Sequence, residues 1–464
     1  MPSRILLIST NKCDFPYPVF PLGLAMIDEA ARRAGHTTRL LDRQFDETPI
    51  KDVIRDFRPD FVGMSLRNID EVVFRHHETH FGPLVDLCHE IHQHLDCPLI
   101  LGGSGFSIFP DQLMELSGAD FGILGEGEKA LTQLLAALET GQDCRGIPGL
   151  FFRSHNRVVS NPGMSPRARL DSDPSSRPPG LAEYYLRESS MLNLQTQRGC
   201  PFECCYCTYP LLEGRSHRRR PPEMVAEEML LLQRHGARYG FIVDSVFNSS
   251  LSHVVETCEA IIRRGVKMRW CCSLRPQGLT REQMHLMARA GLTHVEFGSD
   301  SFCDPVLQAY GKRFTFDDIL SSSELAHAEK IDYCHFLICG GPGETRDTLR
   351  QTYENSKRLP NATILALTGM RVYPGTPLFG HARAHGTCPD AIGLLEPHFF
   401  FSPGLDPDDV TADLAAFSAQ SPNWIVNEPQ PQYYAMASRL RQRGVVGPLW
   451  SYLSLMQRVL PRPI

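Results

Sequence analysis

The feature that most constrains the fold of this chain is an alternation of short apolar runs with longer amphipathic segments, which extends over most of its 464 residues. Apolar runs of about four to eight residues have the length of buried strands, whereas the longer segments repeat apolar side chains with helical spacing. A helix between two strands provides the crossover that lets the strands lie parallel in one sheet. The sequence therefore predicts an α/β protein built from parallel sheets.

The first predicted domain, residues 1–150, is a flavodoxin-like (Rossmann-type) unit. Its helices include residues 22–33 and 83–95, and its strands are expected at residues 5–9, 38–41, 61–65, 99–101 and 121–124. Five parallel strands with crossover helices fit this fold. Ligands of such a sheet bind outside the carboxyl ends of the strands, so the loops that follow the strands are the expected binding region.

A linker is predicted at residues 151–184, because residues 160–179 are rich in Ser, Pro, Arg and Asp and are expected to have little order of their own. The alternation resumes at residues 185–380, with candidate strands at residues 191–196, 239–243, 268–273, 293–297, 333–338 and 365–372. Six such units favour a partial (β/α)6 barrel of the TIM type, whose chemistry belongs at the carboxyl ends of the strands.

The last predicted region, residues 381–464, is small and mostly helical, with helices expected at residues 406–417 and 433–443. It is expected to close the substrate side of the barrel. The chain as a whole is thus predicted to contain two α/β domains in succession, followed by a helical region.

The composition places the protein in a broad class. Apolar residues make up 42% and charged residues 22% of the chain, as is ordinary for a globular protein. The net charge of −6 gives no support for a nucleic-acid partner. The sequence contains neither a long apolar span nor a signal peptide, so no membrane partner is expected. The spacing of the fifteen cysteines does not suggest a disulfide framework, which predicts a reducing, cytoplasmic environment.

Three of these cysteines, Cys200, Cys204 and Cys207, lie in the run RGCPFECCYC at residues 198–207. A cubane iron–sulfur cluster is normally held by four thiolates. Three thiolates in one short loop can hold three corners and leave one iron open, as a catalytic zinc site leaves one position open. Cys205 is predicted not to be a ligand, because adjacent residues in a tight loop cannot easily face the same cluster.

Two other interpretations of the cysteines remain open at this point. A buried cysteine commonly serves as a small apolar residue. A zinc knuckle would need a second Cys/His pair at a suitable distance, and no clear pair follows. The loop follows the first predicted barrel strand, at the end where barrel enzymes place their chemistry, which favours the cluster.

The cysteine spacing resembles that of the radical S-adenosylmethionine (SAM) superfamily, in which an aromatic residue, here Tyr206, precedes the third cysteine. This resemblance implies a [4Fe-4S] cluster on Cys200, Cys204 and Cys207. It also implies that the open iron chelates the amino and carboxylate groups of SAM. These three cysteines are therefore the predicted metal ligands and catalytic residues.

Three loops of the first domain resemble those of the cobalamin-binding domain that precedes many radical SAM domains. They are residues 21–24, 101–107 and 124–128, and the last two are rich in glycine, which lets the backbone approach a flat ligand. Each loop alone is more typical of a structural turn. The resemblance implies cobalamin contacts from Ser65, Arg67, Asn68, Gly102, Gly103, Ser104, Gly125, Glu126 and Gly127.

The chain departs from the pattern of the B12 domains that supply a lower histidine ligand to cobalt. Those domains carry Asp-x-His-x-x-Gly after the first strand, and no histidine stands at that position here. Arg67 follows the third strand and is a poor metal donor because it stays protonated. Near cobalt it would disfavour a lower axial ligand. Alternatively, it binds a phosphate or carboxylate group of the corrin side chains.

The same resemblance implies contacts with SAM at the ends of the barrel strands. Asp244 and Ser245 stand where the family often has Gly-Gly-Glu for the SAM amino group, although a helix N-cap is the alternative for this turn. Glu296 resembles the ribose-side position, with a salt bridge inside the barrel as its alternative. Arg275 is a candidate for the SAM carboxylate.

Two further segments are candidate SAM contacts. Gly340 and Gly341 resemble an adenine-side loop. The basic run at residues 215–220 either clamps a carboxylate or forms a solvated face.

Together the two domains resemble cobalamin-dependent radical SAM enzymes over nearly the whole chain. The resemblance implies a methyltransferase that methylates an unactivated carbon of a small metabolite or of an amino-acid- or peptide-derived substrate. Its cofactors would be SAM, the [4Fe-4S] cluster and cobalamin, with an external electron donor of the flavodoxin or ferredoxin type. Cob(I)alamin would take a methyl group from one SAM, and the reduced cluster would cleave another SAM to a 5′-deoxyadenosyl radical.

Three alternatives to this function stay open. The first is a cobalamin-assisted radical cyclisation or rearrangement without methyl transfer. The second is a radical SAM enzyme whose first domain holds no corrin. The third is a non-catalytic iron–sulfur or cobalamin sensor.

Overall fold

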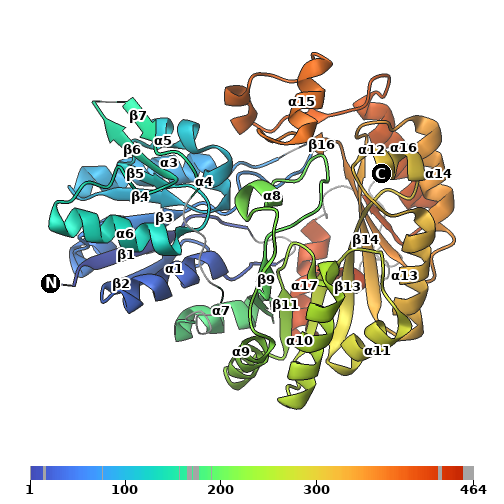
Figure 1. Cartoon of the computed structure of the whole chain (residues 1–464). Coiled ribbons are helices and arrows are strands. Elements are labelled where there is room, and N and C mark those ends of the chain that lie inside the picture. Colours follow the sequence, from blue (N-terminus) through green and yellow to red (C-terminus); the bar gives the residue numbers. More distant parts are fainter. Residues whose placement is uncertain are drawn as a thin grey trace.

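The computed structural model describes residues 2–452 except residues 14–16, 76, 156, 165–169, 171–176, 190 and 427–430, and except the side chains of residues 179, 392 and 431–434. Two seven-stranded sheets with helices around them make up most of the described chain. The first, in blue and teal, lies beside the second, in green to orange (Figure 1). The predicted fold class, a Rossmann-type domain followed by a partial barrel, is confirmed.

The first sheet has the strand order β2-β1-β3-β4-β5-β6-β7. Its five predicted strands are present and parallel: β1 (Arg4–Ser9), β2 (Thr37–Asp42), β3 (Phe61–Ser65), β4 (Leu99–Gly102) and β5 (Phe121–Ile123). Two further strands, β6 (Leu150–Ser154) and β7 (Arg157–Ser160), continue the sheet in antiparallel fashion. The sheet therefore continues past residue 150.

The alternation of side chains along β1 explains how helices cover both faces of this sheet. Ile5 and Leu7 pack with α1 (Leu22–Arg33) and α6 (Gly127–Thr140). Leu6 and Ile8 pack on the opposite face. The helices of that face are α2 (Ile50–Phe57), α3 (Phe81–His94), α4 (Ser104–Ile108) and α5 (Pro110–Ser117).

The predicted linker, residues 151–184, needs a correction at both ends. Strands β6 and β7 pair in antiparallel fashion within its first ten residues, and Phe151 and Phe152 pack on opposite faces of the sheet. Helix α7 (Pro179–Ser189) begins before residue 184 and is tied to the first domain by a 2.7 Å hydrogen bond from the Tyr185 hydroxyl to Asp42. Residues 165–169 and 171–176, which the prediction also covers, lie outside the described residues. The division into domains stays a prediction.

The second sheet is entirely parallel, with the order β18-β15-β14-β13-β12-β11-β8. Its six predicted strands are β8 (Leu192–Leu194), β11 (Tyr239–Ile242), β12 (Arg269–Leu274), β13 (Leu292–Asp300), β14 (Asp332–Cys339) and β15 (Thr363–Thr368). The seventh, β18 (Trp424–Val426), comes from the region predicted to be mostly helical. Its apolar run is only three residues long and directly follows Pro422 and Asn423, so it shows no strand pattern, although Trp424 is fully buried.

Helices lie along the outer side of this sheet (Figure 1). They are α9 (Pro222–Arg234), α10 (Leu251–Arg263), α11 (Arg281–Arg289), α13 (Phe316–Ala328), α14 (Arg346–Ser356) and α16 (Pro407–Gln420). Helix α16 and the last helix, α17 (Pro431–Gln442), match the two predicted in the C-terminal region. Among the described residues, no helix has both the length and the apolar character needed to cross a membrane.

Short elements fill the loops at the carboxyl ends of the barrel strands. Two small antiparallel pairs are formed by β9 (Gln197–Arg198) with β10 (Arg218–Arg219), and by β16 (Met370–Arg371) with β17 (Phe399–Phe400). The short helices are α8 (Tyr209–Leu212), α12 (Asp304–Ala309), α15 (Pro377–Ala384), η1 (Phe247–Ser249) and η2 (Ala391–Leu395). The cysteine loop therefore lies between β9 and α8.

Candidate functional site

A cavity of about 1160 Å³ lies where the carboxyl ends of the two sheets meet. From the first domain it is lined by loops after β1, β3, β4 and β5, and from the barrel by residues at the ends of β8, β11 and β15. The nine residues predicted to contact cobalamin all line it: Ser65, Arg67, Asn68, Gly102, Gly103, Ser104, Gly125, Glu126 and Gly127. The cavity is large enough for a sizeable cofactor together with a small molecule.

Part of the cavity is an apolar slot between the sheet and helices α1 and α6. Leu7, Ile27, Ile123 and Leu131 are among its walls. Gly127 makes room there, since a Cβ on it would lie 2.8 Å from the Ile27 side chain. A deep apolar slot beneath a glycine-lined rim is suited to a flat cofactor that carries an apolar appendage.

The rim of the cavity is shaped by Gly103. Its φ of +98° lies in the region that favours glycine, and a Cβ on it would overlap the carbonyl oxygen of Leu66. The same turn is held by a 2.7 Å hydrogen bond from the Ser104 hydroxyl to the carbonyl of Arg67. The loops after β3 and β4 are thereby fixed to each other, so this rim fits the predicted corrin support.

Arg67 is held in this loop by its backbone and by its guanidinium group. Its N–H donates to Asn11 Oδ1 at 2.6 Å, and Nη1 donates to the carbonyl of Val19 at 3.2 Å. Among the described residues that line the cavity, none is a histidine. The residues present therefore fit a cobalamin that takes no histidine ligand from these loops.

The cysteine loop is fixed by backbone hydrogen bonds. The N–H of Cys200 donates to the carbonyl of Gly214 at 2.9 Å, and that of Cys207 donates to the carbonyl of Cys204 at 3.2 Å. Burial raises the pKa of the Cys200 thiol and raises that of Cys207 to about 12. Binding to metal would have to deprotonate both thiols, as it ordinarily does.

The thiols fit a cluster by their donor chemistry. Within the described residues, no three Cys, His, Asp or Glu side chains converge as the ligands of a single metal ion do. A cubane cluster instead takes one thiolate at each iron corner, and the loop offers three. The fourth thiol of the loop, Cys205, points elsewhere: its sulfur lies 3.8 Å from the sulfur of Met370 in the apolar core.

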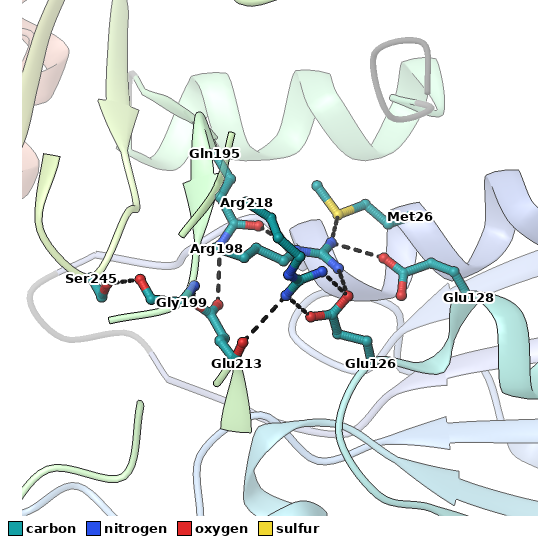
Figure 2. Close-up of polar contacts among 9 residues, drawn as sticks. All are labelled: Met26, Glu126, Glu128, Gln195, Arg198, Gly199, Glu213, Arg218 and Ser245. Carbon is teal, nitrogen blue, oxygen red and sulfur yellow. Dashed lines mark hydrogen bonds and ion pairs between the residues drawn. The ribbon is translucent and has the colours of Figure 1, made fainter. Parts of the chain in front are cut away.

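Asp244 and Ser245 support the cysteine loop. The Asp244 carboxylate accepts hydrogen bonds from the N–H of Thr196 at 2.7 Å, from the N–H of Gln197 at 3.2 Å and from the Thr196 hydroxyl. Burial raises the pKa of Asp244 to about 7 although these bonds favour its charged form. Ser245 donates to the carbonyl of Gly199 at 3.2 Å, as Figure 2 shows.

Tyr206 belongs to a buried polar group beside the cysteines. Its hydroxyl donates to Asp300 Oδ2 at 2.6 Å, and Lys312 Nζ lies 2.6 Å from the same oxygen. Burial opposes the charge of Lys312, but Asp300 and Cys204 outweigh it, so its pKa is raised. This group lies at the end of β13 and on the turn after α12, close to Cys204.

Arg275 and Glu296 occupy two different parts of the barrel. The guanidinium of Arg275 lies 4.1 Å from the centre of the Phe202 ring within the cysteine loop. Glu296 lies within the barrel and accepts a 3.1 Å hydrogen bond from the indole N–H of Trp450. Burial raises the pKa of Glu296 to about 7. Neither residue lines the cavity as the structure describes it.

Gly340 and Gly341 are surrounded by protein side chains. A Cβ on Gly340 would lie 2.8 Å from the Phe401 ring, and one on Gly341 would lie 2.6 Å from Met370. Glu344 folds back over this loop and accepts a 3.3 Å hydrogen bond from the Tyr310 hydroxyl and another from the N–H of Gly340. The structure thus gives both glycines a packing role, and the adenine contact stays a prediction.

An ion cluster joins the two domains at the cavity (Figure 2). Arg198 Nη1 lies 3.0 Å from Glu126, and Nη2 lies 2.8 Å from Glu128. Arg218 also binds Glu126, with a contact of 2.8 Å. On the barrel side, Glu213 accepts from the N–H of Gly199 at 2.9 Å. The carboxylate of Glu126, a residue that lines the cavity, is therefore engaged by arginines.

Sequence reasoning did not assign roles to several of these residues. Arg198 lies in the cysteine motif without a predicted role, and Arg218 has a predicted role only as part of the basic run at residues 215–220. Lys312, Glu213 and Trp450 were not singled out at all. A buried lysine has no local pattern, because its partners come from other elements.

Comparison with known proteins identifies two domain families. The Radical SAM superfamily model matches residues 194–355, and the B12 binding domain model matches residues 11–135. An uncharacterized methyltransferase of Pyrococcus horikoshii is 25% identical, covering 79% of this chain and 79% of its own length. The tryptophan 2-C-methyltransferase of Streptomyces laurentii is 26% identical, covering 77% of this chain and 71% of its own length.

Another relative carries out ring closure. The anaerobic magnesium-protoporphyrin IX monomethyl ester cyclase of Rubrivivax gelatinosus is 24% identical, covering 68% of this chain and 57% of its own length. Among solved structures, the radical SAM methyltransferase TsrM of Kitasatospora setae with tryptophan and a SAM analogue bound has a TM-score of 0.87 and 25% identity, over 98% of both chains. A second TsrM structure, with cobalamin and a [4Fe-4S] cluster bound, has a TM-score of 0.86 at 24% identity, over 99% of this chain and 98% of that one.

Proposed function

This chain belongs to the radical SAM superfamily and carries a B12-binding domain ahead of its radical SAM domain, and from that premise we propose that it is a cobalamin-dependent methyltransferase. The substrate is a small molecule, methylated at an unactivated carbon. The methyltransferases among its relatives support this reaction.

The observation that carries the proposal is that the two sheets open into one cavity. Loops of the first domain line one side of it, and Thr208, Tyr209 and Leu212, which follow the cysteine loop, line the other. When bound, cobalamin would supply a methyl carrier, and the cluster with SAM would supply a 5′-deoxyadenosyl radical. A shared cavity allows both to act on one substrate.

The residues proposed to hold the cofactors follow from this arrangement. Cys200, Cys204 and Cys207 would hold the cluster, with Ser245 and Asp244 fixing their loop. Arg275 and Glu296 are proposed SAM contacts of the barrel. The loops after β3, β4 and β5 would hold cobalamin, and their glycines would allow its close approach.

An amino acid or a small molecule derived from one is the proposed substrate, with tryptophan as the first compound to test. Tyr373 and Thr368 of the barrel line the cavity, together with Phe74 of the first domain. The hydroxyl of Thr368 is buried and has no hydrogen-bond partner among the described residues. This hydroxyl could therefore bind a polar group of the substrate. The relative that methylates tryptophan and the TsrM structure with tryptophan bound support this choice.

A cobalamin-assisted cyclisation is the second candidate function. It is favoured by the likeness to the magnesium-protoporphyrin ester cyclase. Both reactions would use the same cofactors, so the product distinguishes them. In either case a cytoplasmic location and an electron donor of the flavodoxin or ferredoxin type are proposed, because the cluster needs reduced thiols and an electron.

The test is a product analysis under anaerobic conditions. Protein reconstituted with iron, sulfide and cobalamin is incubated with a low-potential reductant, tryptophan and SAM that carries a trideuterated methyl group. A product that is heavier by one labelled methyl group supports methyl transfer. Cleavage of SAM with a product of unchanged carbon number would overturn it in favour of cyclisation or rearrangement. The Cys204→Ala variant is the control for activity that does not need the cluster.

A further inference from the structure

A buried cation lies behind the cysteine loop. The side chain of Lys312 is 6% exposed, and its Nζ lies 2.6 Å from Asp300 Oδ2 and 3.3 Å from the carbonyl of Gly298. The Tyr206 hydroxyl lies 3.5 Å away. Lys312 does not line the cavity in the part of the chain described, so protein groups rather than a ligand of that cavity surround its ammonium.

The turn that carries Lys312 is docked directly on the cysteine loop. The N–H of Cys205 donates to the carbonyl of Tyr310 at 2.9 Å. Gly311 has a φ of +77°, and a Cβ on it would overlap the carbonyl of Glu203 and lie 3.6 Å from Cys204 Cα. Only glycine allows this approach without a shift of the backbone. Backbone packing therefore fixes the turn that carries Lys312 against the cysteine loop.

The positive charge of Lys312 interacts with all three predicted cluster ligands, Cys200, Cys204 and Cys207. The Lys312 ammonium lowers the pKa of the Cys200 and Cys207 thiols against the effect of burial, and Cys204 contributes to the raised pKa of Lys312. A second cation, Arg275, interacts with Cys200 and Cys204. Lys312 thus interacts with all three thiols, whereas Arg275 interacts with two of them.

Asp300, the carboxylate that pairs with Lys312, is held in a strained backbone conformation. Asp300 has a φ of +64°, in the left-handed region that residues other than glycine seldom adopt, where the pairing of β13 with β14 is irregular. Such strain persists where surrounding contacts over-determine the conformation. Here those contacts are the hydrogen bond from Tyr206 and the ion pair with Lys312.

The physical consequence concerns electron uptake. One electron from an external reductant takes a [4Fe-4S] core from the 2+ to the 1+ state, so the negative charge of the cluster and its thiolates increases by one. Net charge, hydrogen bonds and solvent exposure around the sulfurs set the potential of that step. A fixed cation in a site of low dielectric stabilises the added electron.

We propose that Lys312 raises the reduction potential of the iron–sulfur cluster held by Cys200, Cys204 and Cys207, and that Asp300 and Tyr206 position it. Lys312 is thus a positioning residue that makes the cluster easier to reduce. This inference rests on the proposed function only through the cluster, and not through the methyl transfer.

The test compares midpoint potentials of the reconstituted holoenzyme without SAM, measured by titration with dithionite and detection of the reduced cluster by electron paramagnetic resonance. Lys312→Met is expected to shift the potential to more negative values, and Lys312→Arg, which keeps the charge, to shift it less. Asp300→Asn is expected to shift it in the opposite direction, because the thiolates keep Lys312 charged. A purely structural role would not give shifts of opposite sign.

Lys357→Met is the matched control, because Lys357 also pairs with a carboxylate, Glu354 at 2.7 Å, and lies over a tyrosine ring, but on the surface. The cluster of the Lys357→Met variant should have the same midpoint potential as the cluster of the unaltered protein. If Lys312→Met does not fold, Lys312→Gln and Asp300→Asn decide the question. An unchanged potential at full iron content in the Lys312 variant, or a negative shift in Asp300→Asn, would overturn the proposal.

Iron content separates this inference from the proposed function. A protein that binds no cluster would overturn both. A protein that binds the cluster but transfers no methyl group would overturn the proposed function and leave the potentials to decide on Lys312.

Discussion

At the scale of single residues, Cys204 and Cys205 are neighbours with different surroundings. Cys204 lies beside Lys312, whereas the thiol of Cys205 packs against Met370. Replacement of Cys204 by alanine is expected to abolish cluster binding, because it removes one of three thiolates. Cys205→Ala is expected to keep the cluster. Iron content and cluster absorbance after anaerobic reconstitution measure the difference, and equal loss in both variants would contradict the assignment.

A second residue-scale prediction concerns pH. Burial raises the pKa of Glu344 to about 7. A carboxyl group with a raised pKa contributes stability that is complete below its unfolded pKa of about 4.5 and is lost as the pH rises through about 7. The full shift corresponds to about 3 kcal/mol. Glu344→Gln should therefore reduce the fall in thermal midpoint between about pH 5 and pH 8.

The surface variant Glu354→Gln is the control for this experiment, and its pH dependence should match that of the unaltered protein. Asp244 and Glu296, whose pKa values are also raised to about 7 by burial, contribute to the same slope. Only part of the slope should disappear in Glu344→Gln. An unchanged slope would show that Glu344 is ionised in the folded protein near neutral pH.

What the sequence could predict at this scale depends on whether the signal is local. The cysteine loop was predicted because its spacing is contained in eight residues, from Cys200 to Cys207. Lys312 was not, since it meets Tyr206 across 106 positions of the chain. Trp450 reaches Glu296 across 154 positions. Such pairs meet only in the folded chain. The sequence around a lysine or a tryptophan does not indicate which distant residue its side chain will contact.

At the scale of elements, the β9–β10 pair joins the cysteine loop to the first domain. Arg198 lies on β9 with its side chain 8% exposed, and its partner Glu126 is 9% exposed. In Arg198→Met, Arg218 still binds Glu126, whereas Glu128 loses a charged partner. Loss of a hydrogen bond to a charged group costs about 1.5–3 kcal/mol, so the variant should lower the free energy of unfolding by about that amount, as measured by denaturant titration.

Arg219→Met is the matched control for Arg198→Met. Arg219 lies on β10 next to Arg218, and its side chain is exposed. Surface substitutions of this kind usually change stability by less than about 0.5 kcal/mol. If the two variants were equally stable, the ion cluster would not hold the domains together.

Element prediction succeeded where a strand lies in a mostly apolar run of at least four residues between helical segments. The five strands of the first domain and six of the barrel were found because buried parallel strands are continuous apolar runs. The β6–β7 hairpin was missed since its apolar residues lie next to a Ser- and Pro-rich stretch that reads as a linker. Strand β18 was missed because its apolar run has only three residues between Asn423 and Asn427, whereas β5 and β8 lie in longer predicted runs.

At the scale of the whole molecule, the shared cavity predicts that both metals are bound by one chain. Protein made anaerobically with added cobalamin and then desalted should retain about four irons, the content of one cubane cluster, and about one cobalt. Elemental analysis and the absorption spectrum measure both. Iron without cobalt would make the first domain a scaffold that holds no corrin.

The ion cluster between Glu126, Arg198 and Arg218 has a consequence for the modularity of this protein. Arg198 and Arg218 come from one half of the chain, and the carboxylates that they bind, Glu126 and Glu128, come from the other. A first domain taken from another enzyme would have to bring acidic residues at the positions of Glu126 and Glu128 or leave the buried Arg198 without either of these counter-charges. Exchange of the first domain alone is therefore expected to destabilise the chimaeric protein unless this acidic pair is kept.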